Sequence, residues 1–197
     1  MAAFAALSVW SSPEVRERLG WYYAVANNFK PAKYLICRRV PAGEELENLG
    51  EGELWELHAR ASEEFSKIFR EVKDGGLELG RMEPVKPSLL DLKVALVKKM
   101  LRHCNFCRWN CRVDRVAGGK HGTCQLEEES RVSSYFHHRG EELPIRGTKG
   151  SGTIFFTSCN MRCAFCQNAD ISHDKDNGVV FTPQRLAWTM WQLRMEG

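Results

Sequence analysis

The chain has 197 residues, and its 28 basic and 25 acidic side chains nearly cancel to a formal charge of +3. With 43% hydrophobic, 10% aromatic and 27% charged residues, the composition argues against a disordered, collagenous or polybasic protein. The longest apolar run, residues 2–7, is far shorter than the ~20 residues of a membrane span. The amino terminus also lacks the basic start and cleavage site of a secretory signal. We therefore expect a cytoplasmic protein with no membrane partner.

Two helices are predicted in the first half of the chain. Apolar residues recur at helical spacing between Glu53 and Val72, and Asp74-Gly75-Gly76 supplies a stop. We assign the aromatic residues of this helix to core packing. Ser88, three residues before Asp91, resembles the start of a second helix. Both helices are predicted from an apolar face at regular spacing. The aromatic residues assigned to the core of the first helix are Trp55, Phe65 and Phe69.

The last fifty residues predict a strand followed by a helix. The run from Thr153 to Thr157 is β-branched and aromatic, and it is bounded by glycines and polar residues, which indicates a buried strand. Thr182 before Pro183 is typical of a helix start, and an apolar stripe follows. We assign the pair His137-His138 to a solvated loop.

Seven of the eight cysteines fall between residues 104 and 166. Clustered cysteines in a chain without an export signal favour metal binding over disulfides. The eighth, Cys37, lies in the apolar run Tyr34-Leu35-Ile36-Cys37 and is predicted to be a buried thiol.

The clustered cysteines form two groups. The first has the spacing C-x2-C-x3-C-x12-C, and its members are Cys104, Cys107, Cys111 and Cys124. The second has the spacing C-x3-C-x2-C, and its members are Cys159, Cys163 and Cys166. Three thiolates leave one iron of a 4Fe-4S cluster without a protein ligand, so that iron can bind a substrate or cofactor. Zinc with His173 as the fourth ligand is the alternative for the second group.

The stretch from Cys159 to Cys166 follows the predicted strand and has an aromatic residue, Phe165, just before its last cysteine. It resembles the signature of the radical S-adenosylmethionine (radical SAM) superfamily. The longer stretch from Gly150 to Ser172 resembles the pyruvate formate-lyase activating enzyme-like branch of that superfamily. The resemblance covers residues 104–172, and residues 1–87 carry none.

The resemblance implies a 4Fe-4S cluster on Cys159, Cys163 and Cys166, with S-adenosylmethionine bound at the open iron. Reductive cleavage of S-adenosylmethionine would give a 5'-deoxyadenosyl radical that abstracts hydrogen from a substrate, as in glycyl-radical activating enzymes. Phe165 would lie beside the adenine. The implied partners are an electron donor such as a flavodoxin or ferredoxin and a substrate that is left open, a protein among the options.

The resemblance also implies the fold, an α/β protein that ends in the first strand-helix unit of a radical SAM (β/α) partial barrel. We divide the chain into a helical region of unknown role (1–87), a helix with a cysteine-rich metal-binding segment (88–149) and the start of the barrel (150–197). One strand-helix unit is too little to enclose S-adenosylmethionine, so the sequence is expected to be the front portion of such a protein. We therefore expect cluster binding ahead of catalysis, with two alternatives open: a radical SAM enzyme if the chain is complete in vivo, or an inactive fragment.

The first group, Cys104, Cys107, Cys111 and Cys124, could close a zinc tetrahedron or hold an auxiliary iron-sulfur cluster. Its basic flank gives one alternative function, a metal-stabilised module that binds nucleic acid or a protein. If the chain is a radical SAM protein, as the resemblance implies, we expect no nucleic-acid partner. Another alternative is an electron carrier with two clusters. The flanking basic residues are Lys98, Lys99, Arg102, Arg108, Arg112, Arg115 and Lys120.

Overall fold

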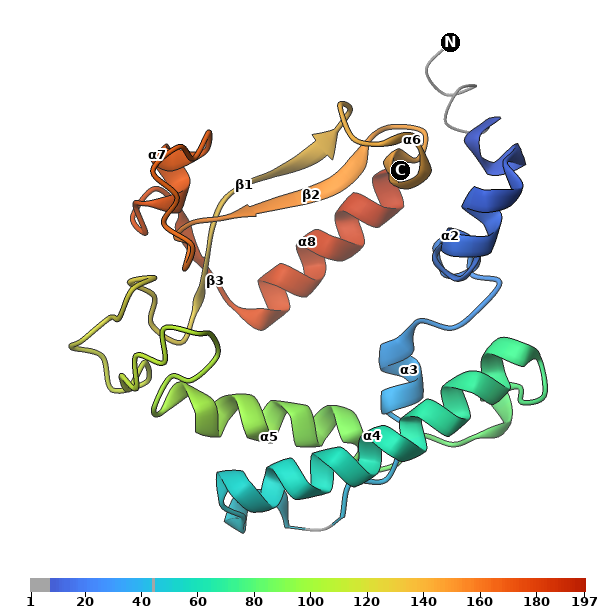
Figure 1. Cartoon of the computed structure of the whole chain (residues 1–197), viewed down its shortest axis with the longest axis horizontal. Coiled ribbons are helices and arrows are strands. Elements are labelled where there is room, and N and C mark those ends of the chain that lie inside the picture. The colour runs from blue at the N-terminus through green and yellow to red at the C-terminus, as the bar shows by residue number, and fades with distance from the viewer. Residues whose placement is uncertain (1–7, 44) are drawn as a thin grey trace. The chain divides into compact units, whose positions relative to one another are not determined.

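The computed structural model describes residues 8–43 and 45–197. The chain forms two compact units, Leu19–Leu101 and a second that joins Met1–Arg18 to Arg102–Gly197 (Figure 1). The apolar run of residues 2–7 lies outside the described residues. Within the described ranges, no helix combines the length and the apolar character needed to cross a membrane.

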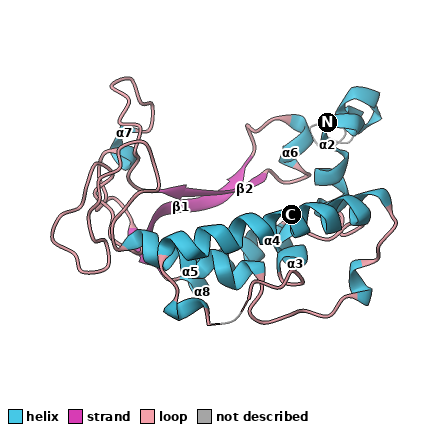
Figure 2. Cartoon of the chain, turned by 60° about the horizontal axis from the view of Figure 1, so that its bottom comes forward, coloured by secondary structure: helices cyan, strands magenta, loops and turns pink. Residues whose placement is uncertain are grey.

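The unit Leu19–Leu101 is built from helices (Figure 2). Its longest elements are α4 (Glu51–Asp74) and α5 (Leu89–Leu101), which pack together with the short helix α3 (Lys33–Cys37). The 3-10 turns η2 (Leu46–Asn48) and η3 (Leu79–Arg81) complete it, and helix α2 (Pro13–Ala26) runs across the boundary between the units. The apolar faces of these helices form one core, which includes Ile36, Val40, Leu54, Ile68, Val72, Leu92 and Leu96.

The two helices predicted in this unit are confirmed, and local signals explain their ends. The backbone N–H of Gly50 donates to Glu53 Oε2 at 2.8 Å at the start of α4, and Gly75 ends it in the left-handed region, with φ 82°. At the start of α5 the N–H of Ser88 donates to Asp91 Oδ2 at 2.8 Å, and the N–H of Asp91 donates to Ser88 Oγ at 3.4 Å. This reciprocal pair is the capping arrangement expected from the sequence.

The predicted core assignments in this unit hold with one exception. Cys37 is buried, and this burial raises the pKa of its thiol. Phe65 and Phe69 pack against the core with their rings stacked. The assignment of Trp55 to the core is wrong, because its side chain lies on the exposed side of α4 and is 45% exposed.

The other unit contains an antiparallel sheet of three strands in the order β2-β1-β3. The strands are β1 (Ser130–His138), β2 (Ser151–Phe156) and β3 (Val179–Phe181), and helix α8 (Pro183–Glu196) packs against all three. Gly152 of β2 allows α8 to pack closely, because an added Cβ would lie 3.1 Å from the Cβ of Leu193. The remaining elements are η1 (Val9–Ser11), α6 (Leu143–Arg146) and α7 (Ala169–Ser172).

The predictions for this unit are confirmed in part. The general class, a mixture of helix and sheet, is confirmed, as is the start of α8, where Thr182 Oγ1 accepts from the N–H of Arg185 at 3.2 Å. The expected strand exists as β2, but its expected burial is wrong. It is an edge strand whose residues are half-buried or exposed, Phe156 at 44%. The loop assignment of His137 and His138 is also wrong, since both belong to β1.

Candidate metal centre

The three cysteines of the second group lie in a closed loop that begins where β2 ends. Thr157 anchors the start of the loop: it is fully buried, its N–H donates to the carbonyl of Arg131 at 2.9 Å, and its hydroxyl donates to the carbonyl of Lys175 at 3.0 Å. The N–H of Ser158 then donates to the carbonyl of Ile171 at 2.8 Å. This bond brings the two ends of the loop together, and residues 158–171 are called the cysteine loop below.

All three thiols of the cysteine loop are free and half-buried. The backbone N–H of Met161 donates to Cys159 Sγ at 3.4 Å, and the Ser172 hydroxyl donates to Cys166 Sγ at 3.3 Å. The N–H of Cys166 donates to the carbonyl of Cys163 at 3.3 Å, which forms a tight turn between these two cysteines. The hydrogen bonds from Met161 and Ser172 would stabilise the negative charge that cysteine sulfur atoms carry when they bind a metal.

The backbone of the cysteine loop takes conformations that are uncommon for residues with side chains. Ser158 and Arg162, which directly precede Cys159 and Cys163, both have positive φ, at 65° and 54°. The Arg162 guanidinium donates to the carbonyls of Ser172 and His173 at 3.4 Å each, so the turn is fixed to the end of the loop. Strained backbone held by surrounding contacts is typical of functional sites.

Two further observations concern the residues that the sequence placed at this site. The imidazole of His173 follows α7, and its Nε2 atom is buried without a hydrogen-bond partner. Both ligand sets, with and without His173, therefore stay open. Phe165 is 90% exposed, so it is not a core aromatic residue.

The first cysteine group begins in a hairpin-like turn. The N–H of Cys104 donates to the carbonyl of Val113, and the N–H of Arg112 donates to the carbonyl of Cys104, both at 3.0 Å. The N–H of Asn110 donates to the carbonyl of Cys107 at 3.0 Å. Residues 104–113, called the hairpin below, thus carry three of the four cysteines of this group.

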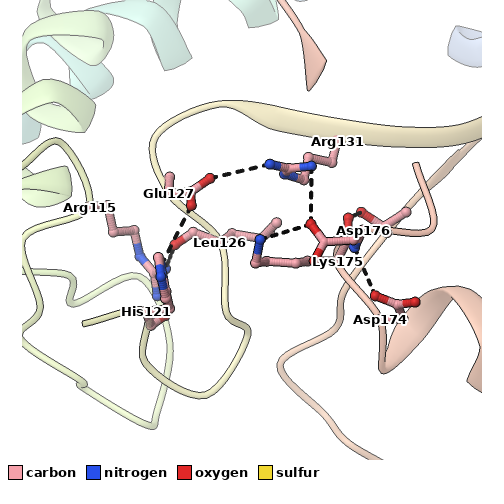
Figure 3. Close-up of polar contacts among 9 residues, drawn as sticks. Arg115, His121, Leu126, Glu127, Arg131, Asp174, Lys175 and Asp176 are labelled. Carbon is pink, nitrogen blue, oxygen red and sulfur yellow. Dashed lines mark hydrogen bonds and ion pairs between the residues drawn. The ribbon is translucent and has the colours of Figure 1, made fainter. Parts of the chain in front are cut away.

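The segment that carries the fourth cysteine is joined to the hairpin through Arg115. Arg115 is only 6% exposed, and its guanidinium donates to the carbonyls of His121, at 3.1 Å, and Leu126 (Figure 3). Burial acts to lower the pKa of Arg115, but its neighbours Cys104 and Cys124 outweigh this effect and raise the pKa. Arg115 was expected in a basic coat available to phosphates, and this expectation is wrong because the guanidinium is buried.

Cys111 belongs to the same arrangement. Its Sγ atom lies 3.7 Å from the Thr123 hydroxyl, and hydrogen bonds from Thr123 are the main cause that lowers the pKa of this thiol. Gly122 packs so closely that an added Cβ would lie 3.0 Å from Cys111 Sγ and 3.3 Å from an Arg115 nitrogen. Three of the four cysteines thus surround one buried guanidinium.

A hydrogen bond joins the first group to the cysteine loop. The indole Nε1 of Trp109, in the hairpin, donates to the carbonyl of Asn160 at 2.6 Å, directly beside Cys159. Ion pairs also join the segments that follow the two groups: Arg131 lies 3.7 Å from Glu127 and 3.5 Å from Asp176 (Figure 3). The two cysteine groups therefore lie next to each other in one unit, although Cys124 and Cys159 are 35 positions apart in the sequence.

The sulfur atoms themselves do not converge. Across residues 8–43 and 45–197, no three His, Cys, Asp or Glu side chains lie close enough together to hold a metal ion. What the arrangement provides is the donor chemistry, with three free thiols in one loop and four in the adjacent segment. Soft thiolate donors of this kind suit zinc and iron-sulfur clusters.

Comparison with known proteins finds a relative of similar sequence. Uncharacterized protein MJ0674 of Methanocaldococcus jannaschii is 40% identical over 176 residues, which make up 86% of this chain and 48% of that protein. The chain thus spans about half the length of this curated relative. No protein-family model matches the chain, and no solved structure matches it.

Proposed function

We propose that the cysteine loop binds a 4Fe-4S cluster through Cys159, Cys163 and Cys166, and that the chain is part of a radical SAM protein of the pyruvate formate-lyase activating enzyme-like branch. The observation that supports this most is the closed loop itself. It leaves the sheet at the end of a strand, is tied at its base by the bond between Ser158 and Ile171, and presents three free thiols.

The donor set fits such a cluster. Three cysteines would ligate three of the four irons. The N–H of Met161 and the hydroxyl of Ser172 already donate hydrogen bonds to two of the sulfur atoms, those of Cys159 and Cys166. The fourth iron would be left for S-adenosylmethionine, and the exposed ring of Phe165 offers a surface for its adenine. When bound, the cluster supplies the electron that cleaves S-adenosylmethionine to a 5'-deoxyadenosyl radical for hydrogen abstraction.

The fold and the partners of the proposal follow from the same assignment. Strand β2, the cysteine loop, β3 and α8 would form the start of a partial (β/α) barrel. The proposed electron donor is a flavodoxin or ferredoxin, and a protein is among the proposed substrates. The cytoplasm is the proposed location, because reduced thiols persist there.

Anaerobic reconstitution of the chain with iron and sulfide tests the ligand assignment. In Cys163→Ser we expect the loss of about four irons per chain. The matched control is Cys37→Ala, which removes a buried thiol from the other unit and should leave the iron content unchanged. If Cys163→Ser keeps the iron content of the unaltered chain, the assignment is wrong.

A second candidate function, binding of single-stranded RNA, is supported by exposed side chains of the hairpin. Phe106, Arg108 and Arg112 are exposed there, and the Arg108 guanidinium lies 5.8 Å from the centre of the Trp109 ring. Aromatic and basic side chains on one surface suit stacked bases and phosphates. The double variant R108A/R112A should lose RNA retention that depends on salt, and RNA retention absent from the unaltered chain at low salt would exclude this function.

A further inference from the structure

We infer that Cys104, Cys107, Cys111 and Cys124 form a closed zinc site, and that this site holds Trp109 of the hairpin against the cysteine loop. The zinc site does not depend on the proposed function. The significance of the contact with Trp109 does, because it rests on the cysteine loop being the cluster site.

Two segments carry the four cysteines of the zinc site, and Arg115 already joins them. The hairpin carries Cys104, Cys107 and Cys111, and residues 121–126 carry Cys124. Arg115 bridges these arms through the carbonyls of His121 and Leu126 and through its position beside Cys104 and Cys124. The four sulfur atoms do not converge among the described residues, so zinc binding would draw the two arms closer together.

The buried positive charge of Arg115 would compensate the negative charge of a zinc site with four thiolates. Four thiolates around one Zn²⁺ ion carry a net charge of about −2, which is costly inside a protein without compensation. The guanidinium of Arg115 supplies a buried positive charge next to this position. Hydrogen bonds from such neighbours orient metal ligands and reduce their charge. On binding, each thiol releases its proton to solvent.

The close packing of Gly122 against Cys111 favours zinc over an iron-sulfur cluster. Gly122 lies against Cys111, with room for no more than a hydrogen atom in place of a side chain. A single zinc ion holds its four sulfur atoms at about 2.3 Å, so it needs less room beside Gly122 than a four-iron cube.

The consequence for the cysteine loop follows from the position of Trp109. It lies between Cys107 and Cys111, so zinc ligation on both sides would fix the backbone from which its indole donates to Asn160 at 2.6 Å. The Asn160 carbonyl adjoins Cys159. Trp109 is therefore a positioning residue: through Asn160 it would hold Cys159, the first proposed cluster ligand, in place.

Metal analysis of the purified chain tests the zinc site. We expect about one zinc ion per chain, its loss in Cys111→Ser and its retention in Cys163→Ser. Zinc lost in the first variant and kept in the second supports the site, whatever the cysteine loop binds. Iron in place of zinc at this group, or zinc that survives in Cys111→Ser, would overturn it.

Hydrogen exchange of the cysteine-loop amides tests the contact of Trp109. Trp109→Phe keeps an aromatic ring but removes the N–H donor, so we expect unchanged zinc content and exchange at least about threefold faster over residues 158–171. The matched control is Trp188→Phe, which alters an exposed tryptophan on α8 and should leave this exchange unchanged. Equal exchange in Trp109→Phe and the unaltered chain would overturn the positioning role. This measurement needs neither cluster nor S-adenosylmethionine, so its failure is distinct from failure of the proposed function.

Discussion

Arg115 shows how one buried side chain organises a segment that has little regular structure. Residues 104–126 contain no helix or strand, so their backbone polar groups need other partners. The Arg115 guanidinium provides donors to two carbonyls and lies beside two thiols. Arg115 therefore joins the hairpin to residues 121–126, in addition to the backbone hydrogen bonds within the hairpin.

We predict that Arg115→Met lowers the free energy of unfolding of this unit by about 2–4 kcal/mol, because the carbonyls of His121 and Leu126 lose their buried donor. Chemical denaturation of the metal-free chain measures this. The matched control is Arg18→Met, whose exposed ion pair with Glu14 should be worth less than about 1 kcal/mol. Equal losses in the two variants would contradict the role of Arg115.

The capping pair of α5 gives a prediction that depends on pH. The hydrogen bond from the Ser88 hydroxyl, at 2.6 Å, is the largest cause that holds the pKa of Asp91 below its ordinary value. A lowered pKa in the folded state contributes stability above the ordinary carboxyl pKa of about 4, and this stability is lost as the pH falls through the folded pKa. Ser88→Ala should therefore cost about 1 kcal/mol at pH ~7 and clearly less at pH ~2.

The control for this prediction is Thr182→Ala at the start of α8. Its hydroxyl caps the helix without a carboxylate partner, because it accepts from the N–H of Arg185. The cost of Thr182→Ala should be similar at both pH values, about 1 kcal/mol. Denaturation curves at the two pH values measure both variants, and a cost of Ser88→Ala that does not change with pH would refute the assignment.

Among the elements, helices with local signals could be predicted from the sequence and short strands could not. The helices α4, α5 and α8 each combine an apolar face with a cap or stop residue within a few positions. Strands β1 and β3 were missed because their stability comes from pairing across the sheet, Val132 with Phe156 and with Val179, and not from a pattern of their own. His137 and His138 look like loop residues in the sequence for the same reason.

The junction between β1, β3 and the cysteine loop makes Gly178 a sensitive position. A Cβ there would lie 2.5 Å from the Thr157 Cγ2 atom and 2.8 Å from the carbonyl oxygen of Val132. We predict that Gly178→Ala lowers the melting temperature of this unit and reduces the cluster content, because Thr157 anchors the cysteine loop. Gly20→Ala in α2, where no atom lies within 4 Å of the added Cβ, should be neutral or stabilising. Similar effects of both substitutions would argue against the anchor.

For the molecule as a whole, all seven clustered cysteines belong to one unit and the large apolar core to the other. The spacing of the cysteines could be read from the sequence. The contact of Trp109 with Asn160 could not, because it joins residues 51 positions apart and depends on how the unit folds. The burial of Arg115 was hidden for the same reason, since a basic residue in a basic segment resembles a surface residue.

This division predicts a local response to metal removal. A strong chelator should speed hydrogen exchange in residues 104–126 and 158–171 and leave exchange in α4 and α5 unchanged, because the core of the helical unit contains no candidate ligand among the clustered cysteines. Hydrogen exchange with and without chelator measures this. Equal acceleration in α4 would show that the helical unit depends on the metal.

Electron paramagnetic resonance of the anaerobically reconstituted and reduced chain, with and without S-adenosylmethionine, tests whether the cysteine loop holds a cluster with an open iron. We expect a 4Fe-4S signal that shifts when S-adenosylmethionine is added, and that disappears in Cys163→Ser. A cluster signal that S-adenosylmethionine leaves unchanged, or zinc as the only metal bound, would contradict the assignment of Cys159, Cys163 and Cys166 as a site with an open iron.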